Sequence, residues 1–221
     1  MEAESLRADA ERNRQALLSA ARAVMSEHGL DAPLDEIARR AGVGNATLYR
    51  RFPTRLDLIV AVFAERMAEH VLAVDEALAE PDAWQAFRRY VTAAAALQVR
   101  DRGIADLVTL QVSSAPEIER LRVRAFRGVE TLIERAKSAG AVRADCTAED
   151  VLVLLQANAG LIERSSRAAP SASARLVHVL LDGLRADAAT SGPAAPSPRR
   201  MSAAMRERSR DFGFEPSPDG G

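Results

Sequence analysis

The chain has 221 residues, of which 48% are hydrophobic, 28% charged and 4% aromatic, and its formal net charge is -1. This is the composition of a globular protein, and the abundance of Ala, Leu, Arg and Glu with few aromatic residues favours an all-α fold. A net charge near zero excludes a uniformly basic protein that coats nucleic acid, so any DNA contact has to come from a local cluster of charge.

Three features bear on the cellular compartment. The segment 1–12 is polar and lacks the apolar core of a secretory signal. The longest apolar stretch, 151–162, is too short to span a bilayer and contains Gln156 and Asn158. The single cysteine, Cys146, allows no internal disulfide and no thiolate metal site, which fits a reducing environment. We therefore expect a cytoplasmic protein with no membrane segment, metal or other cofactor.

The first part of the chain predicts three helices. Apolar residues at helical spacing indicate a helix over 9–28, and Gly29 can end it in the left-handed conformation. Pro33 opens a second helix, which Gly42 breaks after about two turns. A third short helix, 45–52, ends before a proline, because proline disfavours helical geometry in the residue that precedes it.

Four pairs of residues further on have the spacing of a capping box, in which side chains satisfy free amides at a helix start. The pairs are Thr54 with Asp57, Asp82 with Gln85, Ser114 with Glu117, and Thr147 with Asp150. Together with hydrophobic periodicity they predict helices over 54–78, 84–99, 118–139 and 151–164. Periodicity alone predicts two more, over 104–111 and 173–187, which makes about nine helices.

The pattern changes after residue 187. The segment 188–221 contains five prolines among Ser, Gly and Arg, and hydrophobic periodicity is lost. We predict a disordered tail, although 201–208 could form a transient helix. The chain is thus expected to divide into a three-helix unit (8–54), a larger helical body (55–187) and this tail (188–221).

The segment 34–52 reads LDEIARRAGVGNATLYRRF and fits a helix-turn-helix. Two short helices that cross steeply need a small residue at the crossing and a turn residue that tolerates positive φ, which Ala38 and Gly42 supply. A recognition helix of this size would be roughly 12 Å long, comparable to the width of the major groove. Apolar contacts within the three-helix unit would come from Ile37, Val43, Leu48, Leu17, Ala21 and Val24.

A local cluster of positive charge coincides with this segment. Between Pro33 and Arg55 there are five arginines and two acidic residues, a surplus that the whole-chain charge conceals. The arginines are Arg39, Arg40, Arg50, Arg51 and Arg55. Arg39 and Arg40 could equally form a solvated helix face.

Side chains of the third helix suit both kinds of DNA contact. Thr47 and Tyr49 can donate hydrogen bonds to phosphate oxygens, which fix the register without reading sequence. Asn45 can pair with adenine and Arg50 with guanine, while Ala46 can touch a thymine methyl group. Tyr49 could instead be half-buried against the following helix.

The stretch AGVGNATLYRRFPTRLDL, after one helix and before a longer capped one, resembles the signature of the TetR/AcrR family of repressors. The resemblance is specific over 17–63, whereas the later helices match the family only in number, length and order. It implies a homodimer with a DNA-binding head (8–54) and a body that binds ligand and dimerises (55–187). The matching positions imply DNA contacts by Gly44, Asn45, Ala46, Thr47, Tyr49 and Arg51, and a phosphate contact by Arg55 at the start of the fourth helix.

Two departures from the family pattern concern helix starts. Pro33 and Leu34 stand where similar proteins usually place hydroxyl residues, which removes a cap and one hydrogen bond to phosphate. Gly44 replaces the usual Ser or Thr cap of the recognition helix. Neither change threatens the fold, but both obscure the base-reading pattern.

Amides on the apolar stripes of the body are candidates for orienting a ligand, because pockets combine apolar walls with a few polar groups. Buried amides satisfied by the backbone are the alternative. Aromatic residues nearby favour a moderately hydrophobic small molecule. The predicted pocket residues are Trp84, Phe87, Val91, Gln98, Gln111, Phe126 and Asn158.

The helices 151–164 and 173–187 have apolar faces wider than one body needs. We predict that they pair with their copies across a two-fold axis as a four-helix interface, which the family resemblance also implies. Two recognition helices would then meet successive major grooves, about 34 to 36 Å apart. The predicted interface residues are Leu152, Leu155, Ala159, Ile162, Val177, His178, Leu181 and Leu184.

The sequence therefore predicts a ligand-responsive transcriptional regulator, most simply a repressor, that binds a palindromic double-stranded DNA operator and is released by a small hydrophobic effector. Because the helix 54–78 would belong to both head and body, a ligand that shifts it would change the separation of the heads. An enzyme is disfavoured, since His28, His70 and His178 lie on separate helices with no nucleophile, phosphate loop or metal spacing. A helical interaction protein that has lost DNA binding remains an alternative, given the missing hydroxyls.

Overall fold

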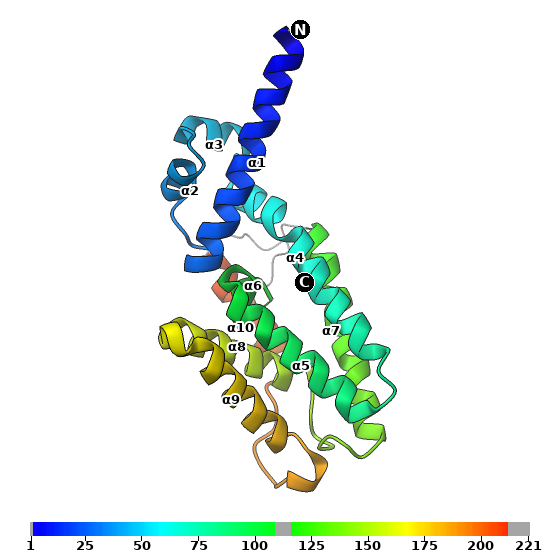
Figure 1. The fold of residues 1–221 in the computed structure, drawn as a ribbon. Coiled ribbons are helices and arrows are strands. Elements are labelled where there is room, and N and C mark those ends of the chain that lie inside the picture. Colours follow the sequence, from blue (N-terminus) through cyan, green and yellow to red (C-terminus); the bar gives the residue numbers. More distant parts are fainter. Residues whose placement is uncertain (1, 109–115, 212–221) are drawn as a thin grey trace.

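The structure is a computed structural model that describes residues 2–108 and 116–211 (Figure 1). Within these ranges the fold is all-α, as predicted, and comprises ten α-helices and two short 3-10 helices. The α-helices are α1 (Glu2–His28), α2 (Leu34–Arg40), α3 (Asn45–Arg51), α4 (Arg55–Leu78), α5 (Ala83–Arg100), α6 (Arg102–Val108), α7 (Pro116–Ser138), α8 (Ala148–Ser165), α9 (Ala169–Gly183) and α10 (Pro198–Asp211). The 3-10 helices are η1 (Ser166–Ala168) and η2 (Ala186–Ala188).

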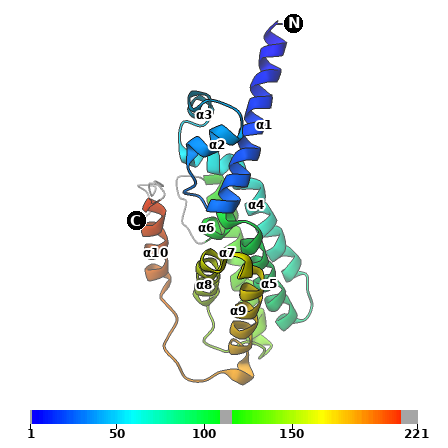
Figure 2. The same cartoon turned by 60° about the vertical axis from the view of Figure 1, so that its left-hand side comes forward.

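Helices α1, α2 and α3 form one end of the molecule, and the start of α1 projects beyond the other two (Figures 1 and 2). We call this unit the head. Its apolar side chains converge as the spacing predicted, with Leu17 and Val24 of α1 buried against Ile37 of α2 and Leu48 of α3. Burial of this shared face stabilises helices that are too short to be stable alone.

The remaining helices α4 to α9 form the body. Helix α4 leaves the head and packs along α7, while α5, α8 and α9 pack on one another (Figures 1 and 2). One cluster of buried residues joins the head to Phe63 of α4 and Ile104 of α6, and a second lies between α4, α5, α7, α8 and α9. Because the first cluster crosses from head to body, α4 and α6 are structural parts of both.

Side-chain caps begin several helices where the sequence predicted them. Thr54 and Asp57 form a complete capping box, in which the Asp57 amide donates to Thr54 Oγ1 at 3.1 Å and the Thr54 amide donates to Asp57 Oδ2 at 2.9 Å. The Gln85 amide donates to Asp82 Oδ1 at 2.7 Å at the start of α5. The Thr147 amide donates to the carboxylate of Asp150 at 2.8 Å. The predicted cap Ser114 lies outside the described residues.

The C-terminal segment differs from the prediction. Residues 198–211, expected within a disordered tail, form α10, which also raises the number of helices from nine to ten. Met201, Met205 and Ser209 lie four residues apart and are buried, so α10 has a narrow apolar seam. The arginine-rich composition of this segment hides three buried residues, which is why composition alone predicted disorder.

In the part of the chain that the structure describes, no helix is long and apolar enough to cross a membrane. Across the same residues, no group of His, Cys, Asp and Glu side chains is arranged to hold a metal ion.

Candidate DNA-binding surface and ligand cavity

The turn between α2 and α3 has the geometry that two steeply crossing helices need. Gly42 has φ +69°, a left-handed conformation that glycine adopts without strain. The Val43 amide donates to the Ala38 carbonyl at 3.0 Å, and the Gly42 amide donates to the Arg39 carbonyl at 3.2 Å. These bonds satisfy carbonyls at the end of α2 in the manner of a Schellman motif. Ala38 and Gly42 thus fill the roles that the sequence predicted.

Both short helices start without a side-chain cap. Pro33 precedes α2 and Gly44 precedes α3, and neither makes a side-chain hydrogen bond to its helix. The first turn of α3 is closed by the backbone alone, with the Thr47 amide donating to the Gly44 carbonyl at 2.9 Å. Both helix starts therefore lack the side-chain cap, as the residues at these positions led us to expect.

Helix α3 buries one face and exposes the other. Leu48 and the following Phe52 are buried in the head, while Tyr49 is 52% exposed. Thr47 is half-buried. The predicted contact residues that are exposed here are Gly44, Asn45, Ala46, Tyr49, Arg50 and Arg51. The sequence therefore located the outer surface of α3 correctly, and this surface combines amide, hydroxyl and guanidinium groups that can meet phosphates and base edges.

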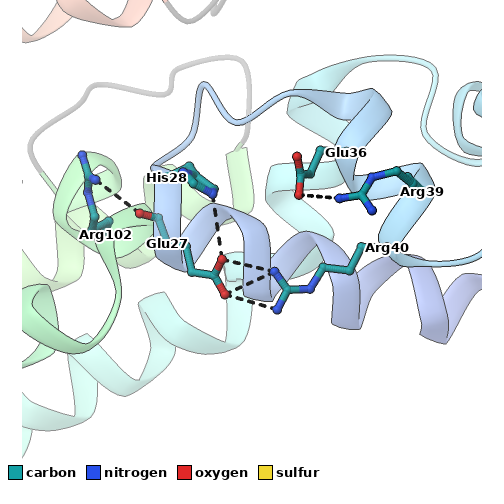
Figure 3. Close-up of polar contacts among 6 residues, drawn as sticks. All are labelled: Glu27, His28, Glu36, Arg39, Arg40 and Arg102. Atoms are coloured by element: carbon teal, nitrogen blue, oxygen red, sulfur yellow. Dashed lines mark hydrogen bonds and ion pairs between the residues drawn. The ribbon is translucent and has the colours of Figure 1, made fainter.

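The two arginines of α2 have different partners (Figure 3). Arg39 is exposed and pairs with Glu36 of the same helix at 3.0 Å. Arg40 Nη1 donates to both carboxylate oxygens of Glu27, at 3.2 Å each, and so ties α2 to the last turn of α1. This hydrogen bond holds the pKa of the Glu27 carboxyl below its ordinary value. Arg40 thus connects two helices of the head, whereas the ion pair of Arg39 stays within α2.

Arg55, predicted to meet phosphate, is hydrogen-bonded to the backbone between α1 and α2. Its Nη1 donates to the carbonyl of Leu30 at 2.8 Å and to the carbonyl of Ala32 at 2.7 Å. These carbonyls follow the end of α1, where no helical amide is available to satisfy them. The capping box beside it also occupies the Thr54 amide. The sequence indicated a basic residue at a position that resembles the family's phosphate contact. It did not indicate that the Leu30 and Ala32 carbonyls would accept hydrogen bonds from this residue.

A small cavity lies in the body between α4, α5, α7 and α8, with one residue of α6 on its wall. Its free volume is about 30 Å³, close to the space of one water molecule and far below the roughly 300 to 1,000 Å³ of ligand pockets. A ligand would therefore have to displace side chains. The lining residues are Met67, His70, Tyr90, Val108, Arg122, Ala125, Phe126, Val129, Ala148, Val151, Leu152 and Leu155.

His70 and Tyr90 are the most deeply buried polar groups of this cavity, at 5% and 2% exposure. Their ring centroids are 5.9 Å apart, and neither side chain has a hydrogen-bond partner among the described residues. Burial lowers the pKa of His70 to about 4 and raises that of the Tyr90 phenol. Arg122, by contrast, is engaged by Glu119 at 2.6 and 2.9 Å. The cavity thus offers two polar groups without partners inside an apolar wall.

The predicted pocket residues lie mostly elsewhere. Of that set, Phe126 lines the cavity, while Phe87 and Val91 are buried in the body core. Asn158 Nδ2 donates to Gln98 Oε1 at 2.8 Å, and Gln98 Nε2 donates to the Leu155 carbonyl at 3.2 Å. Gln98 thus follows the alternative considered from sequence, in which the backbone satisfies a buried amide, whereas Asn158 bonds to a side chain and its Oδ1 has no hydrogen-bond partner among the described residues.

One further pocket candidate, Trp84, also lies apart from the cavity. Trp84 is half-buried, and the Arg185 guanidinium lies 5.0 Å from its ring centroid. Gln111 lies outside the described residues. The sequence analysis did not identify His70 and Tyr90 as cavity residues. The available signal was their spacing, because each lies three or four residues from other buried residues on the same helix.

The predicted dimer residues differ in how much of each the single chain leaves exposed. Leu155, Ile162, Val177 and Leu181 are buried within the chain itself, and Leu152 lines the cavity. Leu184 packs partly buried against the body core, Ala159 lines a cleft beside α10, and His178 is exposed beside Asp182 at 3.6 Å. Both α8 and α9 are apolar on more than one face, so periodicity could not say which face is internal. The large apolar residues exposed on these helices are Val153, at 42%, and Val179, at 47%.

Comparison with known families matches both parts of the chain. The family model described as "Bacterial regulatory proteins, tetR family" matches residues 17–62. The model described as "Transcriptional regulator SbtR-like, C-terminal domain" matches residues 82–186. The two segments correspond to most of the head and most of the body, and both descriptions are of transcriptional regulators rather than enzymes.

Individual relatives agree with these matches. The transcriptional repressor LfrR of Mycolicibacterium smegmatis is 41% identical over 70 residues, a segment that covers 32% of this chain and only about a third (34%) of LfrR. A TetR transcriptional regulator of Streptomyces coelicolor is 34% identical, with 78% of this chain and 98% of that chain covered and a TM-score of 0.49. A regulator of the tetR family from Rhodococcus RHA1 is 18% identical, covers 84% and 98% of the two chains, and has a TM-score of 0.59, which shows a common fold.

Proposed function

This chain belongs to the TetR family of transcriptional regulators, and on that premise we propose that it represses transcription by binding a near-palindromic DNA operator as a homodimer. The observation that carries the proposal is the outer surface of α3, where Asn45, Tyr49 and Arg50 are exposed on a short helix fixed by Leu48. Repression rather than activation is supported by LfrR, which is named a repressor and shares 41% identity over 70 residues.

The test is a selection from random double-stranded DNA at low salt with the purified full chain. We expect an inverted repeat whose half-sites lie about 34 to 36 Å apart, or a multiple of one helical turn. No sequence preference would instead favour a helical interaction protein without DNA binding, an alternative to which the uncapped starts of α2 and α3 give some support. The enriched repeat then serves as the operator in all further measurements.

The homodimer is supported by apolar side chains that α8 and α9 leave exposed. Val153 and half-buried Leu161 lie eight residues apart on α8, while half-buried Leu176 lies three residues before exposed Val179 on α9. Since α8 and α9 pack on each other, their outer apolar residues can form one surface for a second copy.

Sedimentation velocity tests this surface. Val179→Arg should shift the protein toward the monomer and weaken operator binding, because it would place an unpaired charge in the interface. Leu72→Arg is the matched control, since Leu72 is also an exposed apolar residue but lies on α4. A Val179→Arg protein that sediments as the unaltered protein does would remove this interface.

The effector is proposed to be a small, moderately hydrophobic molecule that enlarges the cavity and hydrogen-bonds to Tyr90 or His70. Apolar walls supply most of the binding free energy, and the two unpartnered polar groups would fix orientation. Compounds of this kind can be screened by thermal stabilisation of the protein, with Tyr90→Phe as the variant that removes one hydroxyl.

Binding linkage then identifies an inducer among the compounds that bind. A coupling of about 1 to 3 kcal/mol corresponds to roughly 5- to 150-fold release from the operator. Because coupling between two binding sites is reciprocal, saturating operator must lower the affinity of an inducer by the same factor. A compound whose affinity is unchanged by operator is not the inducer.

A further inference from the structure

Leu30, in the turn between α1 and α2, is held by two charged side chains from different helices. Its amide donates to Asp106 Oδ2 of α6 at 3.0 Å. Its carbonyl accepts from Arg55 Nη1 of α4 at 2.8 Å. Leu30 is itself fully buried. Since hydrogen bonds to charged groups are roughly twice as strong as neutral ones, the position of this turn depends on both helices.

The backbone around Leu30 is shaped to receive the Asp106 carboxylate. Gly29 has φ +86°, and a Cβ at this position would lie 2.6 Å from Asp106 Oδ2. A side chain at Gly29 would therefore be strained by the backbone and would also collide with the carboxylate. Arg208 of α10 lies 3.9 Å from the other carboxylate oxygen, so Asp106 is approached from two sides.

A second contact from α6 reaches the same end of the head. Arg102 Nη1 donates to the carbonyl of Glu27 at 3.2 Å, and the Glu27 carboxylate in turn accepts from Arg40 of α2 (Figure 3). Helix α6 is therefore connected by hydrogen bonds to the end of α1, and through Glu27 to α2.

The other end of α6 reaches the cavity. Val108, two residues beyond Asp106, lines the cavity together with Met67 and His70 of α4. Five of the seven residues of α6 are buried, so close packing of this short helix would couple a displacement of Val108 to Asp106. Because the cavity has a free volume of only about 30 Å³, a ligand inside it has to move its walls. Movement of α6 relative to α4 would separate the two groups that hold Leu30.

We propose that Asp106 is the positioning residue that couples filling of the cavity to the orientation of the DNA-binding head. With the cavity small, Asp106 and Arg55 together fix the turn at Leu30 and hence the orientation of α2 and α3. When the cavity is filled, α6 shifts, the bond from the Leu30 amide is lost, and the heads of the dimer no longer keep the spacing of the operator. This inference rests on the proposed function, since it assigns a residue to the coupling of effector and operator.

The experiment replaces the unknown effector by a side chain that fills the cavity from inside. Ala125→Phe places a ring among the lining residues, and Ala148→Leu is a smaller substitution in case the first variant does not fold. Hydrogen exchange of the Leu30 amide is measured by NMR in the unaltered protein and in the filled variant. We expect exchange at Leu30 to accelerate at least about fivefold on filling, with the amide of Val24, inside α1, unchanged.

Operator binding is then compared between single and double variants. Ala125→Phe should weaken binding at least about fivefold in the unaltered background and have little further effect in Asp106→Ala, because the connection is already lost. Asp106→Asn, which keeps an acceptor oxygen, should restore part of the affinity, and Asp31→Ala, an exposed carboxylate in the same turn, should change nothing.

The outcomes separate the inference from its premise. Unchanged exchange at Leu30 in the folded filled variants overturns the role of Asp106, whether or not the protein binds DNA. The role of Asp106 is also overturned if Ala125→Phe weakens operator binding by the same factor in the Asp106→Ala background as in the unaltered protein. Accelerated exchange in a protein that selects no DNA sequence would leave the connection in place and refute the proposed function instead.

Discussion

The ring of Phe63 on α4 occupies the space that a side chain at Gly103 of α6 would need, since a Cβ there would lie 2.3 Å from Phe63 Cζ. Phe63 is fully buried and cannot swing into solvent. Gly103→Ala should therefore force the two helices apart and lower the free energy of unfolding by about 1 to 3 kcal/mol. Urea unfolding of the variant and the unaltered protein measures this loss.

A matched glycine gives the opposite expectation. Gly160 lies inside α8, and a Cβ there would meet nothing closer than the end of the Arg164 side chain at 3.8 Å. Gly160→Ala should raise the free energy of unfolding by about 0.5 to 1 kcal/mol, since alanine favours helix without a clash. If both substitutions destabilise equally, helix propensity and the close approach of Phe63 do not explain their effects.

Much of the fold was accessible from the sequence because its signals are local. Proline and glycine mark the ends of the short head helices, and pairs such as Thr54 with Asp57 mark the starts of later ones. The exposed surface of α3 also followed from local spacing around Leu48. The helix over 198–211 was not predicted, because its apolar seam consists of only three buried residues in an arginine-rich stretch.

The interior of the body could not be predicted because it depends on pairings between distant residues. Gln98 and Asn158 are 60 positions apart, and nothing in either helix shows that they bond to each other. At the junction with the head, Arg55 likewise donates hydrogen bonds to the carbonyls of Leu30 and Ala32, which are more than 20 positions away. On α8, Leu155 and Val153 are both apolar, and only the packing of α9 and α5 decides that the first is internal.

The Gln98–Asn158 pair predicts a strong non-additivity. Gln98→Leu leaves the Asn158 amide without its acceptor, and Asn158→Leu leaves Gln98 Oε1 without its donor although Gln98 Nε2 keeps the Leu155 carbonyl, so each single change should cost about 1 to 3 kcal/mol of unfolding free energy. The double change removes both amides and should cost less than the sum of the two. Gln156→Leu, at a half-buried position on α8, should stay within about 0.5 kcal/mol. Additive losses would show that the two amides do not depend on each other.

On α3, Arg51 is proposed to contact a phosphate. Arg51→Ala should then weaken binding to all sequences alike and reduce the slope of log affinity against log salt by about one. Arg88→Ala is the control, because Arg88 is exposed on α5, away from the head. Titrations at several salt concentrations measure the slope. An unchanged slope for Arg51→Ala refutes the phosphate contact.

Cys146 should be unreactive in the folded protein. Its side chain is 1% exposed, and burial raises the pKa of the thiol to about 12. Because the thiolate is the reactive form, modification by a disulfide reagent at pH 8 should be at least about 100-fold slower in buffer than in concentrated urea. Comparable rates in the two solvents would mean that the thiol is accessible in the native state.

His70 should make the protein less stable in acid. Burial lowers its pKa to about 4 in the folded state, against an ordinary value of 6.5. Between these values the unfolded chain binds a proton that the folded chain does not, so the free energy of unfolding falls as the pH falls through this window. The loss between pH 7 and pH 4 is about 3 kcal/mol if the unfolded histidine has its ordinary pKa.

The substitution His70→Gln isolates this contribution, because glutamine keeps a polar side chain that does not titrate. Urea unfolding from pH 7 to pH 4 should show a shallower decline for the variant, with the difference between the two proteins changing by about 3 kcal/mol over that range. Parallel declines would mean that His70 is hydrated or charged in the folded protein. In that case the cavity would already be polar without a ligand, and the hydrophobic effector proposed for it would lose its main support.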